Sequence, residues 1–550
     1  MTFRLRAVRA LALLAGFYLL GVVLLAAMAV LDWLLVTRLF SAGAASFEGM
    51  ILTVTVLLAL AIVRGMVVFL RAGRLGPVTD GVAVTPDEQP ALWEQVRAAA
   101  AATGQQPPDE LYLTAEVNAG VAEHSRMLGL IGGRRRMFLG LPLLAGLTVP
   151  QLRAALAHEF GHYGNLDTRL GGITMRGRKA VMRTVELFAT GSTQWHRIIG
   201  SLYMGYARFF LRTSQSVARG QELAADQVAA RYAGRDATAA VLRALPVLGA
   251  AHAHYRDTYA TLGAPVGALP PAGEVHAGFR RMLDARTEEA LAELASGRRA
   301  PRPHRYDSHP PTAERLALIE KLPDDASARA GGPDDGTAAL SLLGDRERVF
   351  AELEARTLTP QAAALPRMSW DELVTARAAA DAESWSRPLR LAVARAERSV
   401  EQGGDAAPHR RRDLAAEDVA DESLPGLPEV LDAFDRGLLW MAVADRLPKP
   451  PQAARLTGVS ARNFVRPRVF DGLAGMVHLH LAAAGLTTPD IAWAGRPGLA
   501  LPEVWERGMD EALDAAVADT PDTAPLRALL AGTDRVALPE PQADAERRTI

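Results

Sequence analysis

The stretch from Thr148 to His162 constrains this chain more than any other part of its sequence. Thr148 is followed three residues later by Gln151, which predicts a capping box, and Pro150 falls in the first turn, where its missing N–H removes no helical hydrogen bond. The residues from Ala154 to Ala157 then add strong helical propensity. The sequence therefore predicts a helix that carries two histidines near its C-terminal end.

These two histidines, His158 and His162, are four residues apart, so both imidazoles project from one face of the helix and can bind one metal ion. Glu159 follows the first histidine and is placed to take a proton from a metal-bound water. The H-E-x-x-H spacing predicts a zinc peptidase site, since zinc binds imidazole and carboxylate groups with one position left open. The alternative is a buried helix with incidental histidines.

Composition narrows both the ligands and the fold. The chain has no cysteine, so disulfides and thiolate zinc sites are excluded and the ligands must be His, Asp or Glu. Lys plus Arg number 61 and Asp plus Glu 62, which gives no overall field that would favour nucleic acid. Abundant Ala, Arg and Leu favour helices. Composition thus favours a mainly α protein, and the H-E-x-x-H motif adds the expectation of an α+β zincin-like peptidase domain with a small β-sheet.

Two apolar runs, at about residues 11–36 and 50–70, are each long enough to cross a bilayer. Arginines flank the outer ends of the pair, whereas the loop between the runs holds only Arg38 and Glu48 near its ends. The positive-inside rule therefore predicts a two-helix transmembrane hairpin over residues 1–75 with both termini in the cytoplasm. We expect a multi-pass protein of the cell membrane whose catalytic domain faces the cytoplasm. The alternative is a signal anchor with a secreted body.

From Gly76 the composition is that of a soluble domain. A helix is predicted over Pro90–Ala102 and strands over Leu111–Thr114 and Arg136–Gly140, with Gly132-Gly133 as a hairpin signal before the second strand. A small sheet directly before the metal helix has a chemical use. An edge strand beside the zinc can hold an extended peptide by main-chain hydrogen bonds.

The second half of the predicted metal site contains Glu222 and Asp226, which are also four residues apart on a predicted helix. They share a face, so one carboxylate can bind the metal while the other accepts a hydrogen bond from a ligand imidazole and fixes its tautomer.

Together these motifs resemble the HtpX and CAAX-prenyl-protease family of gluzincin zinc endopeptidases over about residues 80–320. The resemblance is carried by His158-Glu-Phe-Gly-His162, Asn165, Asp167, Arg219-x-x-Glu222-x-x-x-Asp226 and Asp307-Ser-His309-Pro-Pro-x-x-x-Arg315. It implies one Zn²⁺ per chain bound by His158, His162 and Glu222. Glu159 is then the general base, and Asp226 supports a ligand from behind.

Two further elements follow from the resemblance. Asn118-Ala119 resembles the start of the family's Asn-Ala-Phe-Ala substrate strand, although Gly120-Val121 replaces Phe-Ala. His309 and Arg315 are candidates for the donor that, besides zinc, stabilises the oxyanion. The implied partner is a protein or peptide bound as an extended strand. Members of the HtpX type carry further membrane spans before the third ligand, where this sequence is too polar.

The predicted function is a membrane-anchored zinc endopeptidase that acts in quality control or processing of membrane or membrane-associated proteins. The main alternative is a peptidase-fold scaffold or chaperone-like protein, against which the intact motif argues. A prenyl-peptide processing enzyme would need a large membrane chamber, for which two spans supply too little protein. We expect a membrane partner and no nucleic acid.

The rest of the chain carries less specific signals. Residues 172–218 are basic, and Ile198–Leu211 is apolar enough either to lie at a membrane surface or to pack as an amphipathic hairpin. His276 is predicted in a loop after the third ligand. The peptidase domain is predicted over residues 76–327, followed by a linker and a helical C-terminal region over 328–550, in which no motif carries recognisable chemistry.

Overall fold

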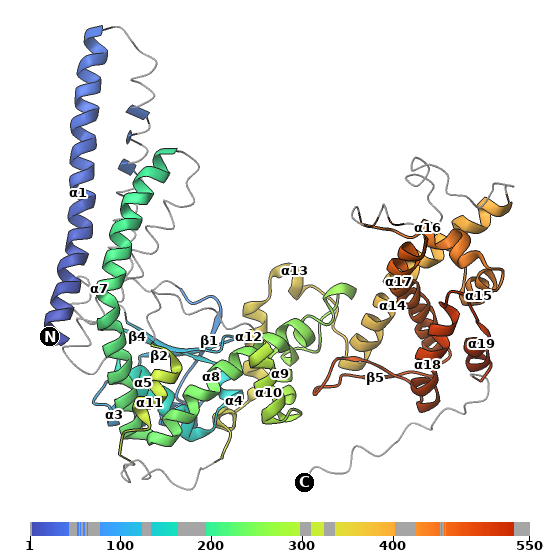
Figure 1. Cartoon of the computed structure of the whole chain (residues 1–550). Coiled ribbons are helices and arrows are strands. Elements are labelled where there is room, and N and C mark those ends of the chain that lie inside the picture. Colours follow the sequence, from blue (N-terminus) through green and yellow to red (C-terminus); the bar gives the residue numbers. More distant parts are fainter. Residues whose placement is uncertain are drawn as a thin grey trace. The chain divides into compact units, whose positions relative to one another are not determined.

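The protein divides into two compact units in a computed structural model, which Figure 1 shows as a whole. The N-terminal unit comprises Met1–Tyr255 and Ala272–Ala363, and the C-terminal unit comprises Arg256–Pro271 and Ala364–Ile550. The structure describes residues 3–42, 77–123, 134–162, 194–297, 310–323, 336–401, 424–450 and 458–532, with isolated positions between 52 and 63 and at 453 and 456. Both units are mainly helical, and the sheets are small.

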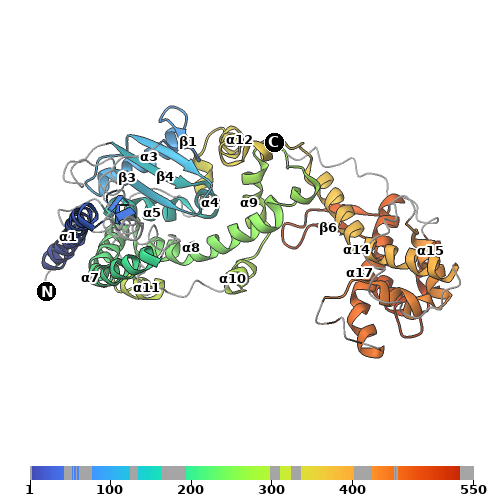
Figure 2. The same cartoon turned by 90° about the horizontal axis from the view of Figure 1, so that it is seen from above.

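Helix α1, Phe3–Ala42, contains the whole first apolar run. It lies beside the long helix α7, Gln194–Ala233, in both views of the molecule (Figures 1 and 2). The second apolar run is described only at isolated positions, where Thr55 donates a hydrogen bond to Asp32 of α1. Within the described residues, no helix satisfies the length and hydropathy expected of a membrane span. The transmembrane hairpin therefore stays a prediction.

A four-stranded sheet forms the centre of the N-terminal unit, with strand order β1-β2-β4-β3. The strands are β1 Gly81–Val84, β2 Glu110–Thr114, β3 Ala119–Glu123 and β4 Arg135–Gly140. β2 and β4 are parallel, and β1 and β3 pair antiparallel on the outside. The substrate strand predicted at Asn118-Ala119 thus falls at the start of an edge strand. Gly132 and Gly133 lie outside the described residues.

One face of this sheet is fully buried. Leu111 and Leu113 alternate with half-buried neighbours along β2, as a strand with one face in the core requires. Helices α3, Pro90–Ala102, and α5, Val149–Gly161, supply the apolar residues on that side. The bounds of α3 agree with its predicted range. The metal helix is therefore fixed in place by the sheet core.

Further helices complete the N-terminal unit. They are α4 Leu141–Gly146, α8 Arg235–Tyr255, α9 Glu274–Asp284, α10 Glu288–Gly297, α11 Thr312–Ile319, α12 Arg346–Thr357 and α13 Pro360–Ala363. The loop prediction for His276 is wrong, because this residue lies in the first turn of α9. Glu354 starts that helix by accepting hydrogen bonds from the backbone N–H groups of Gly273 (2.9 Å) and Val275 (3.3 Å).

The N-terminal unit extends past the boundary predicted at residues 327 and 328. The backbone N–H of Val149 donates to the carbonyl of Thr337 at 2.8 Å, and that of Ala339 donates to Leu147 at 2.8 Å. Leu340 and Val349 then enter the sheet core. Residues 337–363 therefore support the start of the metal helix, although the Gly- and Asp-rich stretch before them has the composition of a linker.

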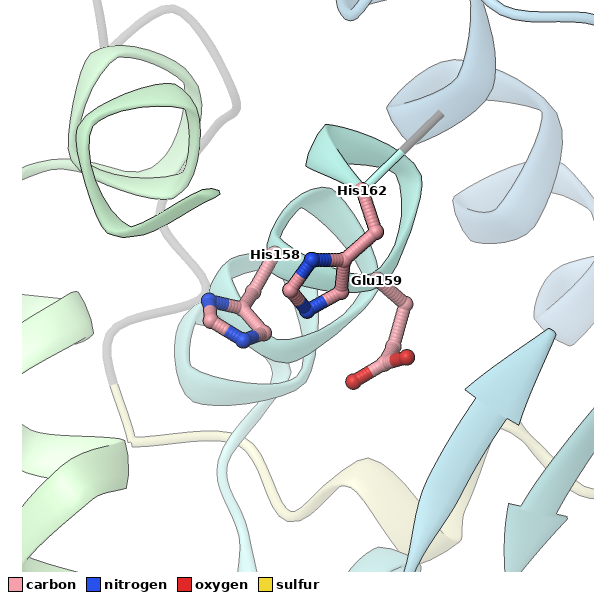
Figure 3. A group of neighbouring side chains, drawn as sticks. All are labelled: His158, Glu159 and His162. Carbon is pink, nitrogen blue, oxygen red and sulfur yellow. The ribbon is translucent and has the colours of Figure 1, made fainter. Parts of the chain in front are cut away.

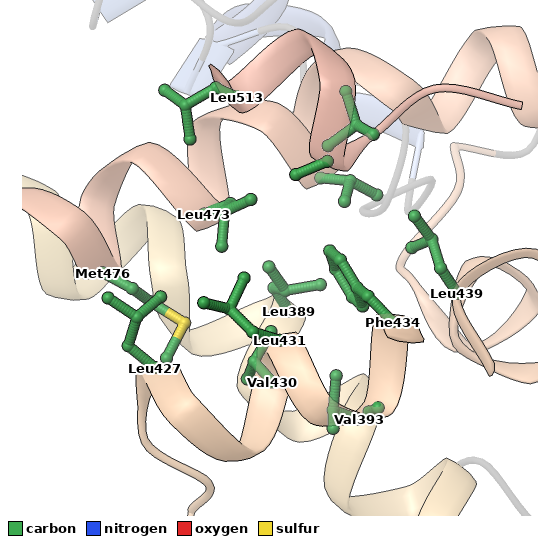
Figure 4. Packing of buried hydrophobic residues seen from close by; sticks show 14 of the residues in the cluster. Leu389, Val393, Leu427, Val430, Leu431, Phe434, Leu439, Leu473, Met476 and Leu513 are labelled. Atoms are coloured by element: carbon green, nitrogen blue, oxygen red, sulfur yellow. The ribbon is translucent and has the colours of Figure 1, made fainter. Parts of the chain in front are cut away.

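The C-terminal unit has its own hydrophobic core, which Figure 4 shows around Phe434 and Leu473. Its helices are α14 Trp370–Glu401, α15 Leu427–Asp435, α16 Ala444–Arg446, α17 Gly458–Ala483, α18 Glu503–Ala516 and α19 Ala524–Ala531. Helix α17 begins at Gly458 and carries Pro467 inside it. The two-stranded sheet of β5, Thr488–Asp490, and β6, Gly498–Ala500, was not predicted.

The segment Arg256–Pro271 joins the C-terminal unit although it lies between two helices of the N-terminal unit. The Tyr259 hydroxyl lies 2.9 Å from the carbonyl oxygen of Ala492, and its ring stacks on Trp493 with centroids 5.0 Å apart. Leu262 packs against Leu373 in the same small apolar cluster. Two separate parts of the sequence therefore build this unit.

Candidate metal centre

Helix α5 presents the two histidines at its C-terminal end, and its start is built as the sequence predicts. The Thr148 N–H donates to Oε1 of Gln151 at 3.0 Å, and the Gln151 N–H donates to Oγ1 of Thr148 at 3.5 Å, so the predicted capping box is confirmed. Leu152, Leu156 and Phe160 face the sheet core. The opposite side of the helix is left for polar chemistry.

On that polar side, His158, Glu159 and His162 form a group whose candidate ligand atoms all lie within 4.8 Å of one another. The imidazole centroids of His158 and His162 are 4.8 Å apart, and the ring planes are inclined by 84°. Figure 3 shows both rings over one side of the helix end, with the Glu159 carboxylate extending towards the neighbouring strand. Both histidines are partly accessible, with side-chain exposures of 16% and 26%.

Glu222 of α7 lies across from these two rings. One of its carboxylate oxygens is 3.6 Å from Nε2 of His158, and the other is 3.8 Å from Nε2 of His162. In a tetrahedral zinc site with bonds of about 2.0–2.1 Å, neighbouring ligand atoms are about 3.4 Å apart. The arrangement therefore fits a metal between two imidazoles and one carboxylate. Glu222 is also buried, with a side-chain exposure of 5%, so its carboxylate faces the two rings inside the domain.

Asp226, one turn further along α7, contacts the other nitrogen of His158, with Nδ1 and Oδ1 3.1 Å apart. Arg315 of α11 holds this carboxylate with two hydrogen bonds, of 2.8 Å from Nε and 2.6 Å from Nη2. Burial alone would raise the pKa of Asp226, but the hydrogen bonds from Arg315 and His158 outweigh burial and hold it below its usual value. Asp226 therefore stays ionised and can fix the orientation of His158.

The same neighbours act on His158. Burial disfavours its charged form, yet the hydrogen bonds to Asp226 and Glu222 raise the pKa of His158 to about 9 in the metal-free protein. A metal that binds Nε2 of this ring must therefore displace a proton from it.

The other predicted site residues are distributed as follows. Ala119 opens edge strand β3, and the carbonyl of Asn118 accepts a hydrogen bond from the N–H of Gly140 at 2.8 Å. His309 lies outside the described residues, as do Asn165 and Asp167. Arg315 was predicted as an oxyanion donor, but its guanidinium is engaged by Asp226, and Nη1 lies 3.5 Å from Glu222.

Sequence reasoning did not identify the pairing of Arg315 with Asp226, nor the part played by Gly161. A Cβ atom at position 161 would lie 2.9 Å from Cα of Ala225, so the absence of a side chain lets α5 and α7 approach closely. The only sequence signal for this approach is the glycine between the two histidine positions. Of the basic hairpin predicted over residues 172–218, the described part is the single helix α7, and the arginines before residue 194 lie outside the described residues.

Comparison with known proteins adds one finding. Residues 86–322 match the model of the family described as Peptidase family M48. The matched range begins just before α3, includes all the residues of the metal centre and ends just after α11. No curated protein and no solved structure matches the chain.

Proposed function

Because residues 86–322 match the model of peptidase family M48, in agreement with the resemblance seen in the sequence, we propose that this protein is a zinc-dependent metalloendopeptidase. One observation carries the proposal. The Glu222 carboxylate faces Nε2 of both His158 and His162 at 3.6–3.8 Å, while the far nitrogen of His158 is held by Asp226. Two imidazoles and one carboxylate without a thiolate are a ligand set of catalytic zinc.

The residues around this centre divide the chemical work. Zinc, when bound, supplies Lewis acidity that polarises a scissile carbonyl and acidifies water. Glu159 accepts the proton of the attacking water and delivers it to the leaving amine, which is general acid–base catalysis. Asp226 and Arg315 keep His158 in one tautomer and orientation throughout.

Edge strand β3 is proposed to bind the substrate. Among the strands that the structure describes, it lies at the edge of the sheet and pairs with β4, from Ala119 opposite Leu139 to Glu123 opposite Arg135. The strand also packs against α5, which places it near the metal helix. An extended peptide that pairs with β3 would be held by main-chain hydrogen bonds. This mode of binding suits cleavage within a chain.

We also propose that the protein is anchored in the cell membrane through the two-helix hairpin predicted over residues 1–75, of which α1 is the first helix, with its catalytic domain in the cytoplasm, and that it acts on membrane or membrane-associated proteins. Large apolar side chains on α1 are exposed, including Leu19 (64%), Val30 (58%) and Trp33 (66%). Exposed apolar surface of this extent is typical of contact with lipid or another protein. The arginine distribution supports the orientation.

The catalytic proposal is tested with Glu159→Gln and Glu222→Gln in the purified full chain. Glu159→Gln removes the base and leaves the ligands, so zinc should stay at about one ion per chain while casein digestion falls by a factor of about 10² or more. Glu222→Gln should lose zinc as well as activity. Wild-type turnover in the first variant would refute the mechanism, and full zinc occupancy in the second would refute the ligand assignment.

The anchoring is tested separately with a reporter fused after Ile550. It should behave as cytoplasmic and fractionate with membranes. A reporter that is active only outside the cytoplasm would overturn the orientation, and recovery in the soluble fraction would overturn the anchor.

A further inference from the structure

The start of α17 and the segment before it form a local excess of positive charge in the C-terminal unit. Between Asp445 and Asp471 the sequence contains no acidic residue, although acidic and basic residues are equally frequent over the chain, 62 against 61. The basic residues in this interval are Arg446, Lys449, Arg455, Arg462, Arg466 and Arg468. A stretch with this excess of positive charge attracts an anionic surface.

Apolar side chains are exposed along the same stretch. Val459 is 68% exposed, and Leu456 and Phe464 are each 36% exposed. The inward side of this part of α17 packs in the core of the unit, where Val465 and Val469 are fully buried. Exposed apolar residues beside arginines, with a buried apolar face behind them, match an element that lies in a membrane interface.

The cations on this surface are only partly neutralised. Lys449 pairs with Asp445 at 3.3 Å, and Arg466 pairs with Asp519. By contrast, Arg462 and Arg468 form no ion pair with any residue that the structure describes. The Arg468 guanidinium lies 5.7 Å from the centre of the Phe464 ring and donates to the Pro448 carbonyl, so a full charge stays next to an exposed ring.

We propose that this surface, defined by Leu456, Val459, Arg462, Phe464 and Arg468, binds the headgroup region of an anionic bilayer. Val459 and Phe464 enter the interface, and the two arginines contact lipid phosphates. An acidic protein would account for the arginines but not for the exposed Val459 and Phe464 beside them, whereas a bilayer interface accommodates both kinds of side chain. The proposal goes beyond the peptidase activity and does not depend on α1 crossing the membrane.

The absence of cysteine from the chain permits a direct test. Ser460, which is exposed next to Val459, is replaced by Cys in the full-length protein and labelled with an environment-sensitive fluorophore. The labelled protein is titrated with vesicles of phosphatidylcholine, with or without phosphatidylglycerol. Emission should shift to the blue only with the anionic vesicles, be quenched by a nitroxide-labelled lipid and weaken as salt is added. Because the label reports on this surface alone, insertion of α1 elsewhere does not imitate the signal.

Two sets of variants isolate the charge and the apolar contribution. Each basic residue at an anionic surface contributes about fivefold in affinity, so Arg462→Gln with Arg468→Gln should weaken the titration about 25-fold at low salt. Val459→Ser should weaken it without any change of charge. Arg507→Gln is the matched control, since Arg507 is 74% exposed on α18 of the same unit and pairs with Glu503.

Three results would overturn the proposal. They are an unshifted label on anionic vesicles, an equal shift on neutral vesicles, and a lipid-independent shift that grows with protein concentration, which would show that a second copy covers the surface. Each variant should unfold at the same temperature as the wild type. The weaker vesicle titration then does not result from unfolding of the variant.

Discussion

Replacement of Gly161 by alanine is expected to weaken the metal centre without altering any ligand. The added Cβ would lie 2.9 Å from Cα of Ala225 and 3.2 Å from its Cβ, where ordinary contacts are 3.4–4 Å. Relief requires α5 and α7 to separate by about 0.5 Å, because a backbone atom cannot rotate away. Ala225 lies between Glu222 and Asp226 on α7, so the separation moves both carboxylates away from the histidines.

The magnitude follows from two opposing effects. Overpacking of a close helix contact costs about 1–3 kcal/mol, and the better helix propensity of alanine returns up to about 1 kcal/mol. We expect a net loss of about 1–2 kcal/mol in the free energy of unfolding. Zinc ligand distances tolerate about 0.2 Å, so zinc affinity should fall by about tenfold or more. Activity at limiting zinc should fall in parallel.

Zinc affinity is measured by competition with a chromophoric chelator, and stability by denaturant unfolding of the apoprotein. Gly249→Ala is the matched control, because this glycine lies inside α8 and a Cβ there would meet nothing within 4 Å. It should leave zinc binding unchanged and add up to about 1 kcal/mol of stability. If Gly161→Ala bound zinc as tightly as the wild type, the close contact would not position Glu222.

Two further predictions concern buried charge. Arg315→Met should lower the free energy of unfolding by about 3–5 kcal/mol, because it leaves the Asp226 carboxylate buried without this partner. Adding Asp226→Asn should restore most of the lost stability but not the activity. An unchanged denaturation midpoint for the single variant would contradict this prediction. Burial, assisted by His252, lowers the pKa of His276 from 6.5 to about 4, so this residue takes up its proton at a higher pH in the unfolded chain than in the folded protein. Its contribution to stability should therefore fall by about 1–2 kcal/mol between pH 7 and pH 5. His276→Gln should flatten that pH dependence in thermal unfolding, and an equally steep profile would exclude this origin.

The metal helix could be predicted because its signals are local. Its cap, its propensity and its histidine spacing all lie within residues 148–162, and the structure places each as expected. Glu222 and Asp226 could be predicted from the sequence for the same reason, since their spacing lies within one helix. The partner of Asp226 could not be predicted from the sequence, because Arg315 is 89 residues away and only the packing of α11 brings it next to Asp226.

The division of the chain could not be predicted, since local composition misleads in both directions. Residues 328–336 have a linker's composition, yet the residues after them return to hydrogen-bond with the start of α5. Arg256–Pro271 lies inside the range matched by the peptidase family, yet it belongs to the C-terminal unit, where Leu262 and Ala268 pack in a small apolar cluster with Leu373. Similarly, Pro467 predicts a helix break, yet α17 continues through it because tertiary packing maintains the helix.

The last prediction concerns α7, which carries Glu222 and Asp226 and also lies beside α1. Helix α7 is one continuous helix of 40 residues, so a change in its contact with α1 is expected to move the two carboxylates that it carries. The sheet is formed by other segments and should be affected less. The His158 and His162 side is fixed independently by the sheet core. Removal of residues 1–42 should therefore weaken zinc binding in detergent solution while the apoprotein keeps its helical content. Equal zinc affinity with and without α1 would show that the peptidase domain alone holds α7 in register.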